Sequence, residues 1–156
     1  EFLEAVQIVK KNYPTVTFIL IGDIEDVFYE SKINFLLKNK LLKYNKFTNN
    51  IKKYLKICDC VVLPSYREGL SKSLLEAASC SRPIITTNVP GCKDIVNEYE
   101  NGLLCSPKNS KSLAKKIIEF INLPDKIKKN MAINNRNKAK VNFDIKIINN
   151  HIINLL

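Results

Sequence analysis

The sequence predicts an α/β fold, a Rossmann-like parallel sheet flanked by helices, and three observations support this prediction. Short apolar runs alternate with amphipathic segments along the chain, which is typical of βαβ units. The runs are rich in β-branched and aromatic residues and end in turn-forming residues, as buried strands do. With 156 residues, of which 46% are hydrophobic, the chain can form one domain with a substantial core. We therefore expect a single domain over residues 1–156.

The same pattern places each element along the chain. The expected strands are short apolar runs closed by glycine, proline or polar residues: 16–21, the weaker 44–47, 60–63, 83–87 and 102–105. The expected helices place apolar residues at helical spacing: 2–12, 25–39, 49–57, 72–80, a short 92–98, 110–121, 125–139 and 143–156. Such sheets bind ligands outside the carboxyl ends of their strands, so the informative loops follow Ile21, Phe47, Leu63 and Thr87.

The chain is strongly basic, with 25 Lys and Arg against 15 Asp and Glu and a net charge of +10 at pH 7. The lysines are scattered over the expected helices, and we interpret them first as solvated helix faces. Attraction to an anionic membrane surface stays open as a secondary role, and we expect no nucleic-acid partner. No run of about 18 apolar residues occurs, so a transmembrane helix is not expected.

The cysteines and the chain start also bear on function. Five cysteines occur without a C-x-x-C pair, and the one histidine, His151, lies far from them, so we expect no metal site. Reduced, mostly buried thiols are typical of a cytoplasmic protein. The chain starts at Glu1 inside an expected helix and has a single methionine, Met131, so we expect it to be a piece of a longer protein.

The loop after Leu63 carries the strongest chemical signal. It reads Pro-Ser-Tyr-Arg-Glu-Gly-Leu-Ser over residues 64–71 and leads into a helix. The N–H groups of Gly69, Leu70 and Ser71 precede the helix, have no helical acceptor and can bind phosphate oxygens. Gly69 also lacks a Cβ that would block the close approach of a ligand.

Glu76 lies more than one turn into this helix, within an otherwise apolar run. We expect its carboxylate to need a partner, and the two hydroxyls of a ribose would satisfy it as donors. The alternative is a structural carboxylate that complements the helix dipole, which is worth about 0.3–1 kcal/mol. The residues alone leave both interpretations open.

Three segments resemble a known family. They are EFLEAVQIVKKNYPTVTFILIGD, VVLPSYREGLSKSLLEAASCSRPIITTNVPGCKDIV and ENGLLCSPKNSKSLAKKI. Together they are similar to the C-terminal, donor-binding half of the bacterial retaining glycosyltransferases with the GT-B fold (family four type, group 1). That family carries two glutamates separated by seven residues, and Glu68 and Glu76 have this spacing. The resemblance covers about residues 1–125.

The resemblance implies roles for the residues of this loop. Glu68 is the candidate catalytic residue and would orient the donor sugar through its hydroxyls, rather than act as a general base. Gly69, Leu70 and Ser71 would present N–H groups to the diphosphate. Glu76 would bind the nucleotide ribose.

Four further residues are implied more loosely. Phe47 and Thr48 would touch the base, and Gly22 lies where the family's turn approaches the donor. Arg67 would approach the sugar or the phosphates, although an exposed loop arginine fits it equally well.

The resemblance also implies an activity. A UDP-sugar, uridine being preferred on resemblance only, would be transferred with retention to a glycan or lipid-linked acceptor in polysaccharide biosynthesis, without a metal or other cofactor. The family's acceptor-binding N-terminal domain, and a basic pair that would precede Glu1, are not in this chain, so we expect the isolated chain to transfer little. From the thiols we expect the enzyme in the cytoplasm, and the net charge leaves a peripheral position on the inner membrane face open. The alternatives are a non-catalytic nucleotide-binding module, a nucleotide-sugar epimerase and a nucleic-acid binder.

Overall fold

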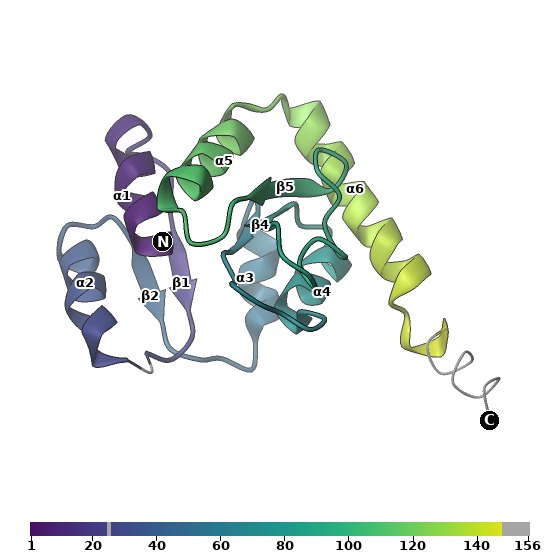
Figure 1. Cartoon of the computed structure of the whole chain (residues 1–156), viewed down its shortest axis with the longest axis horizontal. Helices are drawn as coiled ribbons and strands as arrows, with labels where there is room; N and C mark the ends of the chain where they lie inside the picture. Colours follow the sequence, from purple (N-terminus) through teal and green to yellow (C-terminus); the bar gives the residue numbers. More distant parts are fainter. Residues whose placement is uncertain (25, 148–156) are drawn as a thin grey trace.

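Helices and strands alternate along the chain in a computed structural model that describes residues 1–24 and 26–147 (Figure 1). The strands are β1 (Ile19–Ile21), β2 (Lys43–Asn45), β3 (Val61–Leu63), β4 (Ile84–Thr87) and β5 (Gly102–Cys105). The helices are α1 (Phe2–Asn12), α2 (Val27–Lys38), α3 (Ile51–Ile57), α4 (Lys72–Ser79), α5 (Ser110–Asn122) and α6 (Asp125–Asn142). Every strand pairing in the described residues is parallel, which confirms the predicted fold class.

The strands form two parallel sections instead of one continuous sheet. One section pairs β1 with β2, with Leu20 opposite Tyr44. The other has the order β3-β4-β5, with Ile85 between Val62 and Leu103. All four residues of β4 are buried, whereas β1 and β3 are only partly buried. Across the described residues, β1 and β3 make no pairing with one another.

Two helical layers enclose the strands. On one face, α1 and α5 pack on each other and share a core cluster with Leu36 of α2, Ile85 and Leu103. On the other face, α3, α4 and α6 contribute to a second cluster that contains Ile84. Successive residues of β4 thus point to opposite layers, as the pleat of a buried strand requires.

Most of the expected elements are present, with shifted ends. The first strand starts at Ile19 rather than at residue 16, and β2 ends at Asn45, which leaves Phe47 in a loop. The prediction of a short helix at 92–98 is wrong, because this segment forms a series of turns. Asn101 explains the difference, since its side chain bonds to the N–H of Asn97 (2.7 Å) and to the carbonyl of Ile95 (2.9 Å), which a helix would use itself. Residues 148–156 of the expected terminal helix, with His151, lie outside the described residues.

No helix in residues 1–24 and 26–147 combines the length and the hydrophobicity needed to cross a membrane.

A buried polar pair fixes α6 to the rest of the domain. Asn135 of α6 is fully buried, and its Nδ2 donates to the carbonyls of Arg82 (2.8 Å) and Asn101 (2.5 Å). Its Oδ1 accepts from Nδ2 of Asn101 at 3.0 Å. The same Asn101 forms the turns after residue 91, so the pair connects α6 to the segment that leads into β5.

We predict that Asn135→Ala lowers the free energy of unfolding by about 2–3 kcal/mol, because the carbonyls of Arg82 and Asn101 lose the amide donor of Asn135. Asn137→Ala, on the exposed side of the same helix, is the control and should stay within about 0.5 kcal/mol of the original. Chemical denaturation measures both. Equal stability of the two variants would contradict a structural role for the pair.

Candidate functional site

The carboxyl ends of β1 and β2 bring three of the predicted residues together. Gly22 follows β1 with a φ of +140°, in the region that favours glycine, and its N–H donates to the carbonyl of Asn45 at 3.1 Å. The next residue, Asp23, accepts a hydrogen bond from the N–H of Phe47 at 3.4 Å. Thr48 accepts from the N–H of Asn50 at 3.1 Å, just before α3 begins. The Phe47 side chain is 67% exposed and free to contact a ligand.

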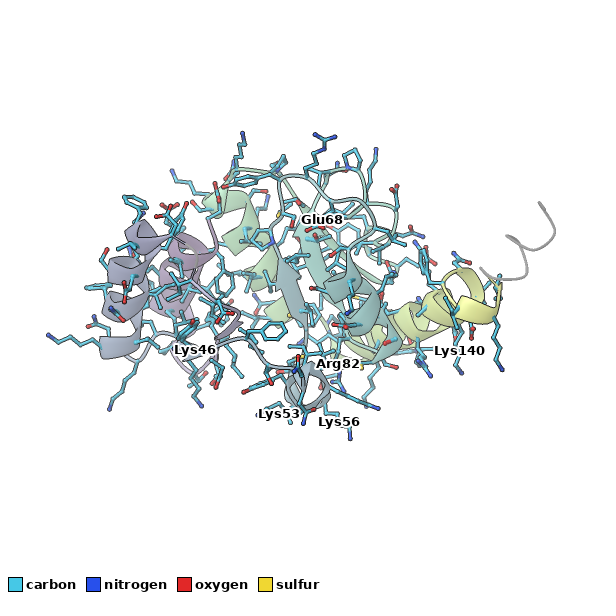
Figure 2. All side chains as sticks on the ribbon, turned by 90° about the horizontal axis from the view of Figure 1, so that it is seen from below. Lys46, Lys53, Lys56, Glu68, Arg82 and Lys140 are labelled. Atoms are coloured by element: carbon cyan, nitrogen blue, oxygen red, sulfur yellow. The ribbon has the colours of Figure 1, made fainter. Side chains whose placement is uncertain are left out.

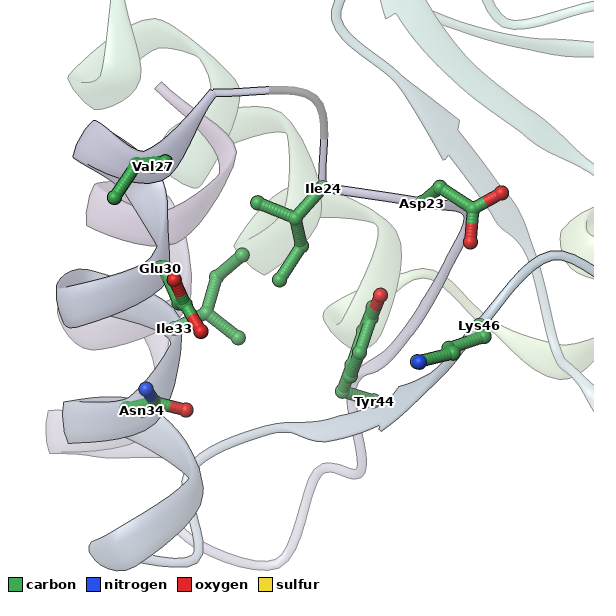
Figure 3. Close-up of a pocket in the computed structure, with 8 residues that line it drawn as sticks. All are labelled: Asp23, Ile24, Val27, Glu30, Ile33, Asn34, Tyr44 and Lys46. Atoms are coloured by element: carbon green, nitrogen blue, oxygen red, sulfur yellow. The ribbon is translucent and has the colours of Figure 1, made fainter.

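Two cavities lie beside these loops. One of about 460 Å³ is lined by the first turn of α1, by Gly22 and Asp23, and by Pro64 after β3. The other, of about 340 Å³, lies between α2 and the ends of β1 and β2, where Figure 3 shows the Lys46 ammonium directed toward Tyr44. Glu68 and Glu76 line neither cavity. These two carboxylates belong to a more open surface at the start of α4.

The start of α4 has the geometry expected of an anion-binding helix end. Ser71 is the N-cap and is 4% exposed, and its hydroxyl makes no capping hydrogen bond. In the described part of the chain, the N–H groups of Gly69, Leu70 and Ser71 have no acceptor. Gly69 and Leu70 are exposed. Three backbone donors are therefore available to a ligand at the positive end of a helix dipole.

Contacts from within the chain orient the rest of this loop. Oε1 of the half-buried Glu68 accepts from the hydroxyl of Ser65 at 2.5 Å. The hydroxyl of Tyr66 donates to Oε2 of Glu1 at 2.5 Å, and this bond raises the pKa of Tyr66 to about 12. Arg67 is exposed, and the described residues contain no ion pair for it. The Glu68 carboxylate is thus oriented, and the Arg67 guanidinium is not.

The sequence predicted that the Glu76 carboxylate needs a partner, whereas in the structure this carboxylate is accessible to water. Its side chain is 38% exposed and lies 4.0 Å from the exposed ammonium of Lys72. The buried face of α4 is formed by Leu74, Ala77 and Ala78, and Glu76 lies beside this face instead of on it. Water and Lys72 can satisfy the carboxylate, so its hydrogen-bonding capacity remains available to a ligand.

Residues that we did not predict hold this loop in place. Thr86 of β4 donates to the carbonyl of Leu63 at 2.7 Å, and Thr87 donates to the carbonyl of Ser65. A pair of threonines at the end of a fully buried strand is the sequence signal that could have indicated them, because a hydroxyl in such a place needs an acceptor.

Gly91 is the second feature that sequence analysis missed. A Cβ built on it would lie 1.9 Å from the carbonyl oxygen of Gly69 and 2.5 Å from that of Glu68, and its φ is +81°. Its N–H donates to Asp94 at 3.0 Å. The contact joins segments some twenty residues apart, which the local sequence pattern does not reveal.

The cysteines and acidic residues form no further reactive cluster in residues 1–24 and 26–147. No three His, Cys, Asp or Glu side chains there are placed to hold a metal ion. All five cysteines are free, with Cys92 and Cys105 buried. Burial raises the pKa of Cys60 to about 12 and that of Cys105 to about 11, so these thiols are poor nucleophiles.

A protein-family model described as "Glycosyl transferases group 1" matches residues 1–139. The chain belongs to this family. The C-terminal domain of a group 1 family glycosyl transferase from Francisella tularensis, LpcC, has a TM-score of 0.80 at 27% identity, covering 92% of this chain and 78% of that chain. The chain therefore has the fold of a GT-B C-terminal domain, as predicted.

Two further comparisons are informative. The chain is 32% identical over 149 residues to the UDP-Gal:alpha-D-GlcNAc-diphosphoundecaprenol alpha-1,3-galactosyltransferase of Escherichia coli, covering 92% of this chain and 38% of that protein. The structure of Anabaena HepE in complex with UDP-glucose has a TM-score of 0.85 at 25% identity, covering 97% of this chain and 43% of that one. The chain spans only 34% to 38% of the length of three curated relatives that it matches.

We predict that Gly91→Ala destabilises the domain by at least about 2 kcal/mol and shifts the backbone amide resonances of residues 68–71, because the new methyl group overlaps the Gly69 carbonyl. Gly69→Ala is the matched control, since nothing lies within 4 Å of its added Cβ and its φ is not positive. Thermal unfolding and amide spectra test both. Unchanged amide positions in Gly91→Ala would show that this contact does not hold the loop.

Proposed function

We propose that the chain is the donor-binding half of a retaining glycosyltransferase that transfers a sugar from a UDP-sugar to a glycan or lipid-linked acceptor in polysaccharide biosynthesis. The observation that carries this proposal is the start of α4. There, three backbone N–H groups without acceptors lie between an oriented Glu68 and an accessible Glu76, in a chain that belongs to the glycosyl transferases group 1.

The geometry suits the chemistry of such a transfer. The leaving diphosphate gains negative charge as the bond to the sugar breaks, and oriented N–H groups with a helix dipole stabilise that charge. Glu68, oriented by Ser65, would bind sugar hydroxyls and orient the donor. Arg67 is free to approach the sugar or the phosphates. Transfer without a metal or other cofactor is part of the proposal.

The nucleotide and acceptor rest on the relatives. HepE binds UDP-glucose, and the Escherichia coli relative is named for UDP-Gal and a diphosphoundecaprenol acceptor. We extend UDP-sugar binding to this chain, with the ribose at Glu76 and the base near Phe47 and Thr48. We extend the proposal to the cytoplasm, a reducing compartment, and the five free thiols support this location.

We predict that Glu76→Gln weakens UDP binding by about tenfold, because a neutral amide is a weaker acceptor for the ribose hydroxyls than a carboxylate. Glu100→Gln is the control and should bind like the original chain, because Glu100 is exposed and its carboxylate accepts from Asn97, outside the proposed site. Isothermal titration with UDP gives both affinities. Equal affinity for the two variants would remove Glu76 from the ribose site.

The second candidate is a nucleotide-binding module without catalysis, and UDP binding alone does not separate it from the enzyme. A sugar-transfer assay does, using the protein with its acceptor-binding domain and a UDP-sugar. Transfer that Glu68→Gln abolishes supports the enzyme, and binding without transfer supports the module. We expect the isolated chain to transfer little.

A basic surface supports a further partner, the anionic face of a membrane. Residues 31–58 contain eight lysines and no acidic residue: Lys32, Lys38, Lys40, Lys43, Lys46, Lys52, Lys53 and Lys56. Lys52, Lys53 and Lys56 are exposed on α3, beside Ile57, which is 71% exposed. The acidic Asp59 follows shortly after α3 in the sequence. Figure 2 shows Lys53 and Lys56 on the side of the molecule remote from Glu68. This surface can bind lipid headgroups without covering Glu68.

We predict that the triple variant Lys52→Gln, Lys53→Gln and Lys56→Gln binds roughly 100-fold more weakly to mixed phosphatidylglycerol and phosphatidylcholine vesicles, at about 1 kcal/mol per lysine. The control is the triple variant Lys93→Gln, Lys111→Gln and Lys115→Gln, which changes exposed lysines elsewhere. It has the same net charge as the first triple variant. Vesicle sedimentation at low and high salt measures binding. Equal loss in both variants would indicate net charge alone, without a role for the α3 surface.

A further inference from the structure

The outer face of α2 carries large apolar side chains that the core does not use. Phe28 and Phe35 have the spacing that places both on one side of a helix, and they are 64% and 56% exposed. Val27 beside them is exposed as well. The two buried residues of α2 are Ile33 and Leu36, and Leu36 joins the core cluster. By contrast, α4 and α5, every residue of which the structure describes, expose no large apolar side chain.

This outer face, formed by Val27, Phe28 and Phe35, lies at the margin of the molecule. Figure 1 shows α2 at the left end of the domain, with no other described element beyond it, and α6 at the opposite end. The other side of the helix reaches the candidate donor loops, because the cavity of about 460 Å³ is lined by Lys32 of α2 together with Gly22 and Pro64. A flat partner placed against α2 is therefore close to these loops.

Exposed basic side chains accompany this face and continue along the chain. Residues 31–46 contain no acidic residue and five lysines, all of them exposed: Lys32, Lys38, Lys40, Lys43 and Lys46.

The two acidic residues described near the start of α2 are directed elsewhere. Asp26 caps the helix by accepting from the N–H of Phe28 at 2.8 Å. Glu30 lines the cavity between α2 and the ends of β1 and β2, as Figure 3 shows. The charge beside the outer face of α2 is therefore mainly positive.

Lys32 joins the apolar and the basic parts of this surface. It follows Phe28 by one helical turn, and its ammonium is 4.8 Å from the centroid of the Phe28 ring. A lysine stem is apolar and long enough to hold its ammonium among phosphate groups while a neighbouring ring lies among acyl chains. Aromatic residues beside lysines are typical of helices that lie in the interfacial region of a bilayer.

The charge also favours a bilayer over a second copy of the chain. Two copies that buried this face against each other would bring their lysines together, and like charges across an interface are unfavourable. An anionic bilayer is attracted by the same lysines. In the view of Figure 2, Lys46 lies between α2 and the α3 lysines Lys53 and Lys56, so the positive charge extends toward the surface already proposed to bind headgroups.

We propose that the outer face of α2 inserts into the interfacial region of an anionic membrane. Phe28 and Phe35 enter the boundary between headgroups and acyl chains, and Lys32 extends to the phosphate groups. This inference deepens the proposed membrane partner, on which it rests: the α3 lysines attract the chain, and α2 supplies the apolar contact. The insertion holds the candidate donor loops near the membrane surface, where the head of a lipid-linked acceptor is located.

Tryptophan fluorescence tests the insertion directly, because the chain contains no tryptophan. On binding to mixed phosphatidylglycerol and phosphatidylcholine vesicles, we expect the emission of Phe35→Trp to shift to shorter wavelength and to be quenched by lipids brominated on their acyl chains. Ile133→Trp is the matched control, since Ile133 is 57% exposed on α6 at the opposite end of the molecule, and it should show neither change.

The emission also separates this inference from the proposed role of the α3 lysines. Unquenched Phe35→Trp in vesicle-bound protein would overturn the insertion of α2 and leave the α3 lysines as the membrane contact. Quenching of both tryptophan variants would contradict a specific contact at α2. A chain that does not bind these vesicles at all would contradict both proposals.

A second experiment measures how much the rings contribute to binding. The double variant Phe28→Ser and Phe35→Ser should bind the same vesicles about tenfold more weakly, because the two rings no longer leave water. The control, Ile133→Ser with Val141→Ser, removes exposed apolar side chains from α6 and should bind like the original chain. Equal binding of the two double variants contradicts the insertion.

Folding and association of the variants are measured alongside. Circular dichroism shows whether the double variant of α2 is folded, and if it is not, Phe35→Trp decides alone, because tryptophan keeps an apolar ring at this exposed position. Sedimentation in buffer tests the other occupant. A dimer of the original chain that the serine substitutions dissociate would assign this face to a second copy and overturn the proposal.

Discussion

The position of the candidate site depends on the close approach of two backbones, at Gly91 and at Glu68–Gly69. The loop over residues 64–71 has no ladder of its own, because β3 ends at Leu63. Its conformation comes from outside, through the threonine hydroxyls of β4 and through the α-carbon of Gly91 lying against the Gly69 carbonyl. Since β4 is buried on both faces and paired on both sides, it is a rigid reference for the loop.

The two glutamates of the site differ in how their side chains are held, and the difference suits different tasks. Glu68 already accepts a short hydrogen bond from Ser65, which fixes one oxygen and leaves the other for a ligand. The contact of Glu76 with Lys72 is long and exposed, and such pairs contribute close to nothing to stability. Exchanging that contact for the two hydroxyls of the proposed ribose ligand would therefore cost little. An oriented carboxylate fits the sugar, where geometry decides reactivity, and an adaptable one fits a group that only needs to be held.

Local patterns predicted the elements well and the long-range contacts poorly. The apolar runs that end at Ile21, Leu63 and Thr87 are strands because their residue types are incompatible with exposure, and this is visible in the sequence. The prediction of a helix at 92–98 failed because the side chain of Asn101, a few residues further along the chain, bonds to backbone groups that the helix would need. The start of α4 was predictable from local turn chemistry. The restraints from β4 and Gly91 were not, since they join segments that only the fold brings together.

The candidate site combines loops from both sheet sections. Its geometry therefore depends on how the two sections are placed relative to each other. The expected base contacts, Phe47 and Thr48, follow β2, whereas the expected phosphate and sugar contacts follow β3. At the carboxyl edge, the bond from Tyr66 to Glu1 connects the loop after β3 to α1, and α1 shares a core cluster with residues of both sections. A nucleotide that contacts both parts would favour one separation of the two sections. A change elsewhere in the domain that alters this separation would then change the affinity for the nucleotide, and nucleotide binding would favour the matching separation by the same factor.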